Sequence, residues 1–211
     1  MVALDEAALS GALAQLARGG VVAAATESYF GLLADITNPA AVEALFGLKP
    51  RGADKGVPTI LPGVGSWRAL VQGPIPSLAQ AFADALWPGG LSIALPAAAS
   101  VSPRVALDGT LAVRVPGASP AAELARRFGR PLSATSANLP GAPPAVHSAA
   151  VVQSFAAAIA QGVLLVVDGE SPGGAPSTVV RVSEGEYAVA RVGAVPVSAL
   201  DEIAHTLTSR A

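Results

Sequence analysis

Four short segments of the sequence combine small, hydroxylated and charged side chains where regular structure is expected to end. They are ATESYFGL (25–32), KPRGADKG (49–56), SATSANLPG (133–141) and GGAPSTVVRV (173–182). The second segment holds both lysines of the chain, Lys49 and Lys55, whereas the other 11 of the 13 basic residues are arginines. An ammonium group is a compact point charge and a guanidinium is a broad planar fork. This bias marks the lysines as candidates for a role that arginine cannot fill.

The residue types in these segments are those of a phosphate site. Lys49 and Arg51 stand two positions apart, so in an extended loop both can reach one polyanion from the same side. Hydroxyl and amide groups, and glycines that permit close backbone approach, are supplied by Ser133, Thr135, Ser136, Asn138, Gly173, Gly174, Ser177 and Thr178. Neither G-x-x-x-x-G-K-[ST] nor G-x-G-x-x-G occurs. A nucleotide site of a less familiar kind remains open. Each segment taken alone is more typical of an ordinary polar turn, and only their joint occurrence in this order favours a site.

Composition narrows the chemistry further. The sequence contains no cysteine, which excludes disulfides, thiolate metal ligands and a cysteine nucleophile. His147 and His205 are isolated, without partners at metal-ligand spacing, and no metal ligand set is predicted. The formal net charge of −2 argues against a chain-wide nucleic-acid surface, although the basic residues at 49–55 form a local positive patch.

The sequence predicts a soluble, cytoplasmic protein. No apolar run reaches the roughly 18–20 residues that a membrane-spanning helix needs. The N-terminus, MVALDEAALS, has Asp5 and Glu6 where a secretory signal peptide has basic residues. We therefore expect neither a signal peptide nor contact with a membrane.

Helices and strands are expected to alternate along the chain, which predicts an α/β (α+β) fold with sheet and helix layers around one core. Residues 1–211 show no repeat and no linker, and we expect a single domain. Segments 25–32, 133–141 and 173–182 adjoin predicted strands, and 49–56 is the loop after the second predicted helix. In open α/β sheets, ligand crevices form outside the strand ends. Helices are predicted at 5–17, from 39 to about 47, and at 77–86, 119–129, 148–160 and 198–208, and strands at 20–26, 57–62, 91–96, 111–116, 130–138, 162–170, 177–182 and 187–192.

The order of these motifs resembles the threonylcarbamoyl-adenylate synthase family, the YrdC-like proteins. ATESYFGL is similar to the family's Pro-Thr-Glu/Asp-Thr-Val-Tyr-Gly-Leu stretch, and Lys49, Arg51 and the following DKG to its Lys-x-Arg motif. WPGGLSIAL, LAVRVP, SATSANLPG, PSTVVRV and ARVGAV match its later motifs, so the resemblance covers about residues 10 to 197. It implies a twisted, open mixed sheet with flanking helices and a concave, positively charged site.

The resemblance also implies an activity. Members of the family condense L-threonine, bicarbonate and ATP into threonylcarbamoyl-AMP and pyrophosphate, with Mg²⁺ accompanying ATP. Partner proteins then transfer the threonylcarbamoyl group to adenosine 37 of transfer RNA, and direct binding of double-stranded RNA is a further expectation.

Residue by residue, the resemblance implies three groups of site residues. The catalytic, phosphate-binding set is Lys49, Arg51, Ser136 and Asn138. Thr26, Ser28 and Phe30 would shape the threonine pocket. The carboxylate of threonine or the nucleotide would be held by Arg114, Ser177, Thr178 and Arg191, with Lys55 and Thr135 added to the nucleotide-binding set.

The sequence departs from the family pattern at four positions. Ala25 replaces a proline, Tyr29 a small aliphatic residue, Gly52 a proline and Pro140 a serine. Ala25 and Tyr29 adjoin the expected threonine pocket, so a paralogue without threonine-specific activity is one alternative. A non-catalytic RNA-binding module is the second, and a carbamoyl-adenylate-handling domain, which belongs to larger carbamoyltransferases, is the third.

Overall fold

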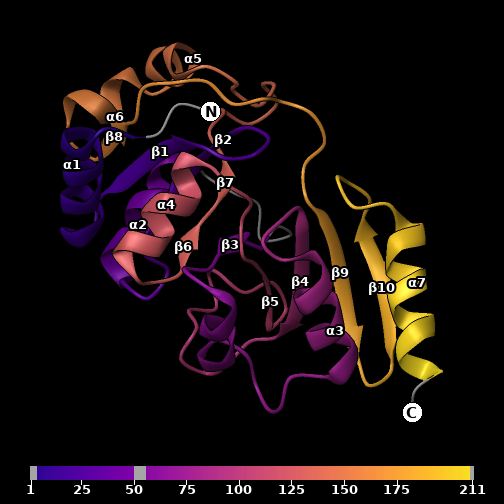
Figure 1. The fold of residues 1–211 in the computed structure, drawn as a ribbon. Helices are drawn as coiled ribbons and strands as arrows, with labels where there is room; N and C mark the ends of the chain where they lie inside the picture. The colour runs from indigo at the N-terminus through magenta and orange to yellow at the C-terminus, as the bar shows by residue number, and fades with distance from the viewer. Residues whose placement is uncertain (1–3, 50–55, 210–211) are drawn as a thin grey trace.

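The computed structural model describes residues 4–49 and 56–209, so the predicted site residues Arg51 and Lys55 lie outside the described part. The strands form two open mixed sheets with helices packed against them (Figure 1). The smaller sheet has the order β7-β2-β1-β8 and the larger one β10-β9-β4-β5-β3-β6. The mixed α/β fold with open mixed sheets and flanking helices, expected from the sequence, is therefore confirmed.

The smaller sheet is built around a buried hairpin. It consists of β1 (Val21–Ala25), β2 (Phe30–Leu33), β7 (Thr135–Ser136) and β8 (Leu164–Val166). β1 pairs with β2 in the antiparallel sense and with β8 in the parallel sense. Every residue of β1 is buried because helices pack close to it on both sides, which suits its short VVAAA side chains. These helices are α1 (Glu6–Ala17), α2 (Pro39–Leu48), α4 (Pro120–Phe128) and α5 (Ser148–Ser154), and α6 (Ala156–Ala160) packs on β8.

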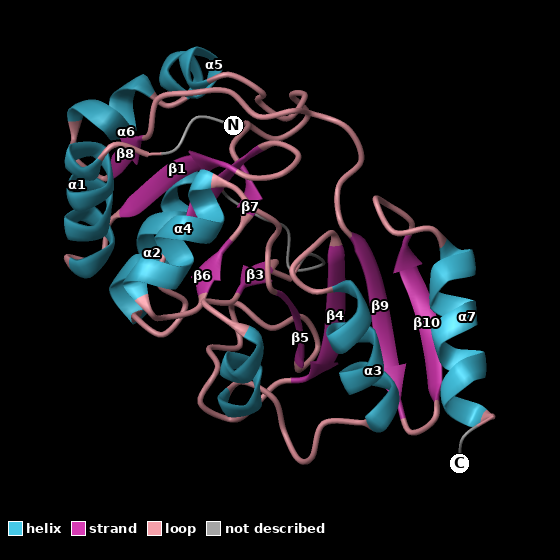
Figure 2. Cartoon of the chain, viewed as in Figure 1, coloured by secondary structure: helices cyan, strands magenta, loops and turns pink. Residues whose placement is uncertain are grey.

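The larger sheet separates its two faces by alternation. It consists of β3 (Thr59–Ile60), β4 (Leu91–Pro96), β5 (Thr110–Arg114), β6 (Leu132–Ser133), β9 (Thr178–Ser183) and β10 (Glu186–Arg191). One face is covered by α3 (Ser77–Leu86) and α7 (Val197–Thr208), as Figure 2 shows, and buries Leu91, Ile93 and Val180. The opposite face carries small side chains such as Ser92 and Ala94 and borders a cavity.

One connecting segment joins the two sheets. Residues 167–177 run without helix or strand from β8 to the start of β9, and Figure 1 shows this orange trace crossing between the sheets. The backbone N–H of Gly173 donates to the carbonyl of Ser28 at 2.7 Å. The hydroxyl of Tyr29 donates to the carbonyl of Gly174 at 2.6 Å. The β1–β2 turn is thereby attached to the segment that leads into the larger sheet.

The structure adds four elements to the predicted order. The strand expected at 130–138 is divided into β6 and β7, because β6 pairs with β3 in the larger sheet and β7 with β2 in the smaller one. β2 was expected to be part of a loop, because its four residues FGLL show no alternation and only pairing with β1 makes them a strand. A 3₁₀ helix at Val64–Ala69 was also not expected. The helix expected at 148–160 is divided at the buried Phe155, whose φ of −123° and ψ of 26° are not helical.

Two expectations about organisation have different outcomes. The described residues contain no helix that combines the length and the apolarity needed to cross a membrane. The prediction of one domain over residues 1–211 stays a prediction.

Candidate functional site

A cavity of about 350 Å³ lies where the two sheets approach each other. This volume is within the usual range of small-molecule sites. The smaller sheet contributes the β1–β2 turn and β7, the larger sheet contributes Arg114, and the connecting segment contributes Pro176 and Ser177. Of the predicted site residues in the described part, the cavity is lined by Thr26, Ser28, Phe30, Arg114, Thr135, Ser136, Ser177 and Arg191.

The β1–β2 turn is organised by the hydroxyl of Thr26. This hydroxyl donates to the carbonyl of Tyr29 at 2.7 Å and accepts from the backbone N–H groups of Ser28 and Tyr29, each at 3.2 Å. Side-chain bonds of this kind replace backbone bonds in tight turns. These bonds hold Ser28 and Tyr29 at the cavity wall. Because the hydroxyl hydrogen of Thr26 is used inside the turn, the Ser28 hydroxyl is the better placed of the two to bind a ligand.

Lys49 joins the end of α2 to β7 at the edge of the cavity. α2 begins with Pro39 after the N-cap Asn38, and Lys49 is the residue that ends it. The Lys49 ammonium donates to the Ser136 carbonyl at 2.5 Å, to the Ser136 hydroxyl at 3.0 Å and to Oδ1 of Asn138 at 2.8 Å. Ser136 also donates to Oδ1 of Asn138 at 2.6 Å. A charge-assisted cluster therefore joins three predicted site residues that are up to 89 positions apart in the chain.

Two guanidinium groups of the larger sheet, those of Arg114 and Arg191, line the cavity and provide positive charge. The side chain of Arg114 is 8% exposed and forms an ion pair with Glu27 of the β1–β2 turn. Burial, and then the charge of Arg114, lower the pKa of Arg191. One carboxylate facing two guanidinium groups leaves a positive surplus, which an anionic ligand would balance.

Arg191 and Ser177 form a unit at the start of β9. Nε and Nη2 of Arg191 donate to the Ser177 carbonyl at 3.1 and 2.8 Å, and Nη2 also donates to the Ser177 hydroxyl at 3.1 Å. Close packing here requires a glycine after β10, since a Cβ on Gly193 would lie 2.1 Å from the Pro176 carbonyl oxygen. This contact explains the glycine of the ARVGAV stretch.

A second cavity of about 500 Å³ continues from the first over the open face of the larger sheet. The two cavities share Pro58 and Arg191. The floor of the second carries small side chains, including Ser92, Ala94 and Ala112. A ligand larger than an amino acid can therefore extend from the first cavity onto this groove.

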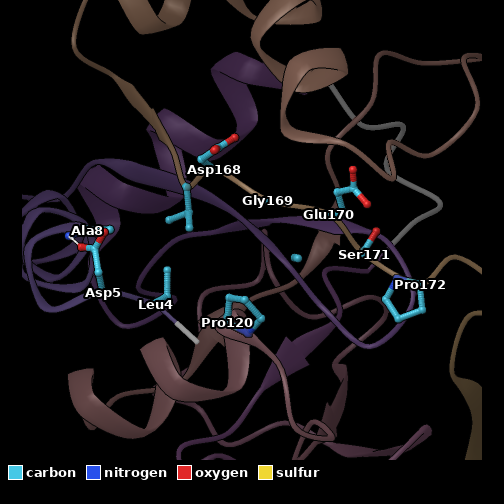
Figure 3. A pocket seen from close by; sticks show the side chains of 11 residues that line it. Leu4, Asp5, Ala8, Pro120, Asp168, Gly169, Glu170, Ser171 and Pro172 are labelled. Carbon is cyan, nitrogen blue, oxygen red and sulfur yellow. Dashed lines mark hydrogen bonds between the residues drawn. The ribbon is translucent and has the colours of Figure 1, made fainter. Parts of the chain in front are cut away.

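A third cavity, of about 540 Å³, has a different character (Figure 3). Its charged lining residues are Asp5, Asp168 and Glu170, with no lysine or arginine among the described residues that line it. Asp5 caps α1, Asp168 accepts from Ser148 and Glu170 pairs with His147. These carboxylates would repel a phosphate, so the cavity between the sheets is the better candidate for a nucleotide.

Two predicted residues hold positions that differ from the expectation. Thr178 does not line the cavity: it is fully buried, and its hydroxyl donates to the Val195 carbonyl at 2.6 Å and accepts from two backbone N–H groups. Thr178 thus supports the loop after Arg191, and the polar β-strand motif gave no sign of this because the side-chain direction depends on the strand register. Phe30 lines the cavity but is only 1% exposed and belongs mainly to the core.

The sequence reasoning missed Glu27 and Ser92 as parts of the site. Glu27 lies inside the first motif, between Thr26 and Ser28, and only these two hydroxyl residues were assigned to the threonine pocket. Its role as the partner of Arg114 depends on a contact between residues 87 positions apart. Ser92 lies in an apolar strand, where the period-two alternation could have indicated a side chain on the open face.

Comparison with known proteins identifies the family. The Sua5/YciO/YrdC family model, described as "Telomere recombination", matches residues 14–193. The chain belongs to this family. The resemblance noted in the sequence motifs is therefore confirmed.

Relatives of this chain include proteins that carry the name threonylcarbamoyl-AMP synthase. Threonylcarbamoyl-AMP synthase of Thiobacillus denitrificans is 37% identical over 185 residues, which cover 86% of this chain and 94% of the relative. The enzyme of that name from Pyrococcus abyssi is 32% identical over 187 residues, covering 88% of this chain. The chain spans about half, 54%, of the length of this archaeal relative.

A solved structure of the family shows the same fold. Pyrococcus abyssi Sua5 complexed with L-threonine superposes with a TM-score of 0.85 and 27% sequence identity. The match covers 96% of this chain and 58% of the Sua5 chain.

Proposed function

We propose that this protein is an L-threonylcarbamoyladenylate synthase, which condenses L-threonine, bicarbonate and ATP into threonylcarbamoyl-AMP and pyrophosphate. Its relatives carry the name threonylcarbamoyl-AMP synthase, and a family structure is complexed with L-threonine. The observation that carries the proposal is the cluster of Lys49, Ser136 and Asn138 beside a cavity that two guanidinium groups line.

The Lys49 cluster is the proposed phosphate site. An ammonium group that already points at hydroxyl and amide oxygens is preorganised for phosphate oxygens, which replace weaker neutral acceptors. The Ser136 hydroxyl is then available for the α-phosphate or the carbamate. Nδ2 of Asn138 donates to the carbonyls of Leu139 and Ala142, so Asn138 holds the loop and keeps its Oδ1 beside Lys49 and Ser136. Arg51 and Lys55, outside the described residues, remain predicted contributors to the same positive field.

The proposed threonine site is the part of the cavity near Arg114 and Ser177. The Arg114 guanidinium and the Ser177 hydroxyl are the cavity's donors for a carboxylate. Ser28 provides a hydroxyl on the facing wall. Arg191 and the groove over β4 and β9 would hold the nucleotide, since the groove continues from the cavity past Arg191.

Mg²⁺ is proposed to enter together with ATP as part of the substrate. Among the described residues, no group of three or more histidine, aspartate or glutamate side chains has the arrangement of a metal site. A cation that accompanies ATP would be held mainly by phosphate oxygens and water, the coordination that Mg²⁺ prefers with nucleotides. Mg²⁺ would neutralise charge on the departing pyrophosphate.

The chemistry needs positioning more than covalent help from the protein. The threonine amine attacks the bicarbonate carbon, and loss of water leaves a carbamate. A carbamate oxygen then forms a bond to the α-phosphorus while the bond from that phosphorus to the bridging oxygen of pyrophosphate breaks. Catalysis of such a displacement depends on alignment of the reactants and on stabilisation of the developing charge, here by Lys49 and the neighbouring hydroxyl groups.

The product would serve the modification of transfer RNA. We infer that partner proteins in the cytoplasm transfer the threonylcarbamoyl group to adenosine 37, so contact with transfer RNA is indirect. Any direct affinity for double-stranded RNA would be recognised by its steep decrease with salt concentration.

The proposal is tested by pyrophosphate release with ATP, Mg²⁺, bicarbonate and each amino acid in turn. We expect turnover that depends on threonine and on bicarbonate. Lys49→Ala should reduce kcat by about 10²–10³-fold, the usual effect of removing a preorganised charge-stabilising donor. Lys49→Arg should also be impaired, because a planar fork does not reproduce the three contacts of a compact ammonium.

Arg68→Ala is the matched control, since it removes a cation that lines none of the three cavities described above. It should retain wild-type turnover. Full activity of Lys49→Ala, or turnover without bicarbonate, would contradict the mechanism. Turnover with another amino acid in place of threonine would instead indicate a paralogue of different specificity.

A further inference from the structure

Ser92 lies at the junction of the two connected cavities. It is the second residue of β4, is 3% exposed and borders the groove over the larger sheet. Its Oγ lies 2.9 Å from Oγ of Ser177, which lines the cavity between the sheets. Ser92 belongs to β4, and Ser177 immediately precedes β9. The two serines lie close together because β4 and β9 are paired in the parallel sense.

The direction of the Ser92–Ser177 hydrogen bond decides what Ser177 can offer to a ligand. A serine hydroxyl has one hydrogen and two acceptor lone pairs. One lone pair of Ser177 already accepts from Nη2 of Arg191 at 3.1 Å. If Ser177 donated to Ser92, its only hydrogen would be used and it would present no donor to the cavity. If Ser92 donates, both lone pairs of Ser177 are filled and its hydrogen is left for a ligand.

An anionic ligand selects the second arrangement. A carboxylate or phosphate oxygen can only accept, so it repels the Ser177 lone pairs and attracts its hydrogen. Ser92 can reverse its role without moving, because a hydroxyl rotates to donate or to accept. The Arg191 donor cannot reverse, since guanidinium has no acceptor.

We propose that Ser92 is a positioning residue that directs the hydroxyl hydrogen of Ser177 toward the anionic group of the bound amino acid. The inference deepens the proposed function and rests on it, because it takes the threonine carboxylate as the group that Ser177 holds. Ser92 itself touches no reacting atom. It acts through Ser177, and in its absence Ser177 loses the donor that fixes its orientation.

The test compares Ser92→Thr with Ser92→Val, two variants of nearly the same shape. Both are β-branched and suited to a strand, and both add nearly the same volume at a position that borders the groove, so any effect of size is shared by the two variants. Only threonine keeps the hydroxyl. The Kd for L-threonine is measured by calorimetry, and the KM for threonine and kcat by pyrophosphate release.

We expect Ser92→Val to weaken threonine binding about fivefold, the value of one ordinary hydrogen bond, and to raise KM more than it lowers kcat. Ser92→Thr should recover most of the affinity. In a Ser177→Ala background, Ser92→Val should have little further effect, because residues that act through one another are not additive. Ser183→Ala, an exposed serine at the far end of β9, is the control and should bind as the wild type does.

Three results would overturn the inference. Equal affinity of the valine and threonine variants, with a wild type that binds and turns over threonine, would refute the role of Ser92 and leave the proposed function intact. An undiminished effect of Ser92→Val in the Ser177→Ala background would show that Ser92 acts by another route. A wild type that neither binds nor turns over threonine would refute the proposed function, and the inference with it.

Discussion

The ion pair between Glu27 and Arg114 joins the two walls of the candidate site, and Glu27→Gln tests what it contributes. The glutamine keeps the shape and one acceptor oxygen but removes the charge. The Arg114 side chain is 8% exposed and that of Glu27 25%, so the substitution leaves a largely buried guanidinium without its counter-charge. The pair also links the β1–β2 turn of the smaller sheet to β5 of the larger one.

The expected loss of stability follows from this burial. Removing one partner of a buried ion pair costs about 3–5 kcal/mol. Two features reduce that figure here. Glutamine can still accept from Arg114. Oε2 of Glu27 is already buried without a hydrogen-bond partner among the described residues, so the glutamine Nε2 in its place exchanges one unpaired polar atom for another and adds none. We therefore expect a loss of about 2 kcal/mol, or about 4–8 °C in Tm for a chain of this size.

The assay is urea and thermal unfolding followed by circular dichroism near neutral pH. Glu43→Gln is the matched control, because it makes the same substitution in the Arg104–Glu43 pair, whose side chains are 46% and 64% exposed. Exposed pairs contribute about 0–1 kcal/mol, so this variant should stay within about 4 °C of the wild type. Equal effects of the two substitutions would refute the argument that burial at the cavity wall makes the Glu27 pair strong.

Two further predictions concern tyrosine hydroxyl groups. Burial, followed by the hydrogen bond to Asp201, raises the pKa of Tyr187 from 10.0 to about 12. The stability that the protonated Tyr187 hydroxyl contributes is complete below pH 10.0 and is lost as pH rises to about 12. In urea unfolding, the free energy of unfolding of the wild type relative to Tyr187→Phe should therefore decline over this pH window. A difference that stays constant with pH would contradict the prediction. Tyr29→Phe removes the bond to the Gly174 carbonyl and should speed hydrogen exchange of the Gly173 amide without lowering Tm by more than a few degrees, whereas Tyr187→Phe should leave that amide unchanged.

Local sequence patterns predicted most of the elements because their causes are local. Asn38 followed by Pro39 indicated the start of α2, and the α3 pattern gave the observed bounds, Ser77–Leu86. These features depend on caps, on backbone preferences and on the periodicity of a few neighbouring residues. β2 was missed because its identity depends on a partner strand, and the division at Phe155 because it depends on what the side chain packs against.

The same distinction between local and long-range causes applies to the candidate site. Residue types and motif order alone indicated a phosphate-binding protein and pointed to Lys49, Ser136 and Asn138 as its basic and polar groups. Their joining into one cluster, the pairing of Arg114 with Glu27 and the contact between Ser92 and Ser177 each bring together residues about 85 or more positions apart. Such contacts are decided by how the strands pair and by which face of a sheet each side chain takes, and a shift of one residue in register would turn Ser92 into the core. The residue types alone therefore indicate the kind of ligand, whereas their arrangement around one cavity depends on the folded chain.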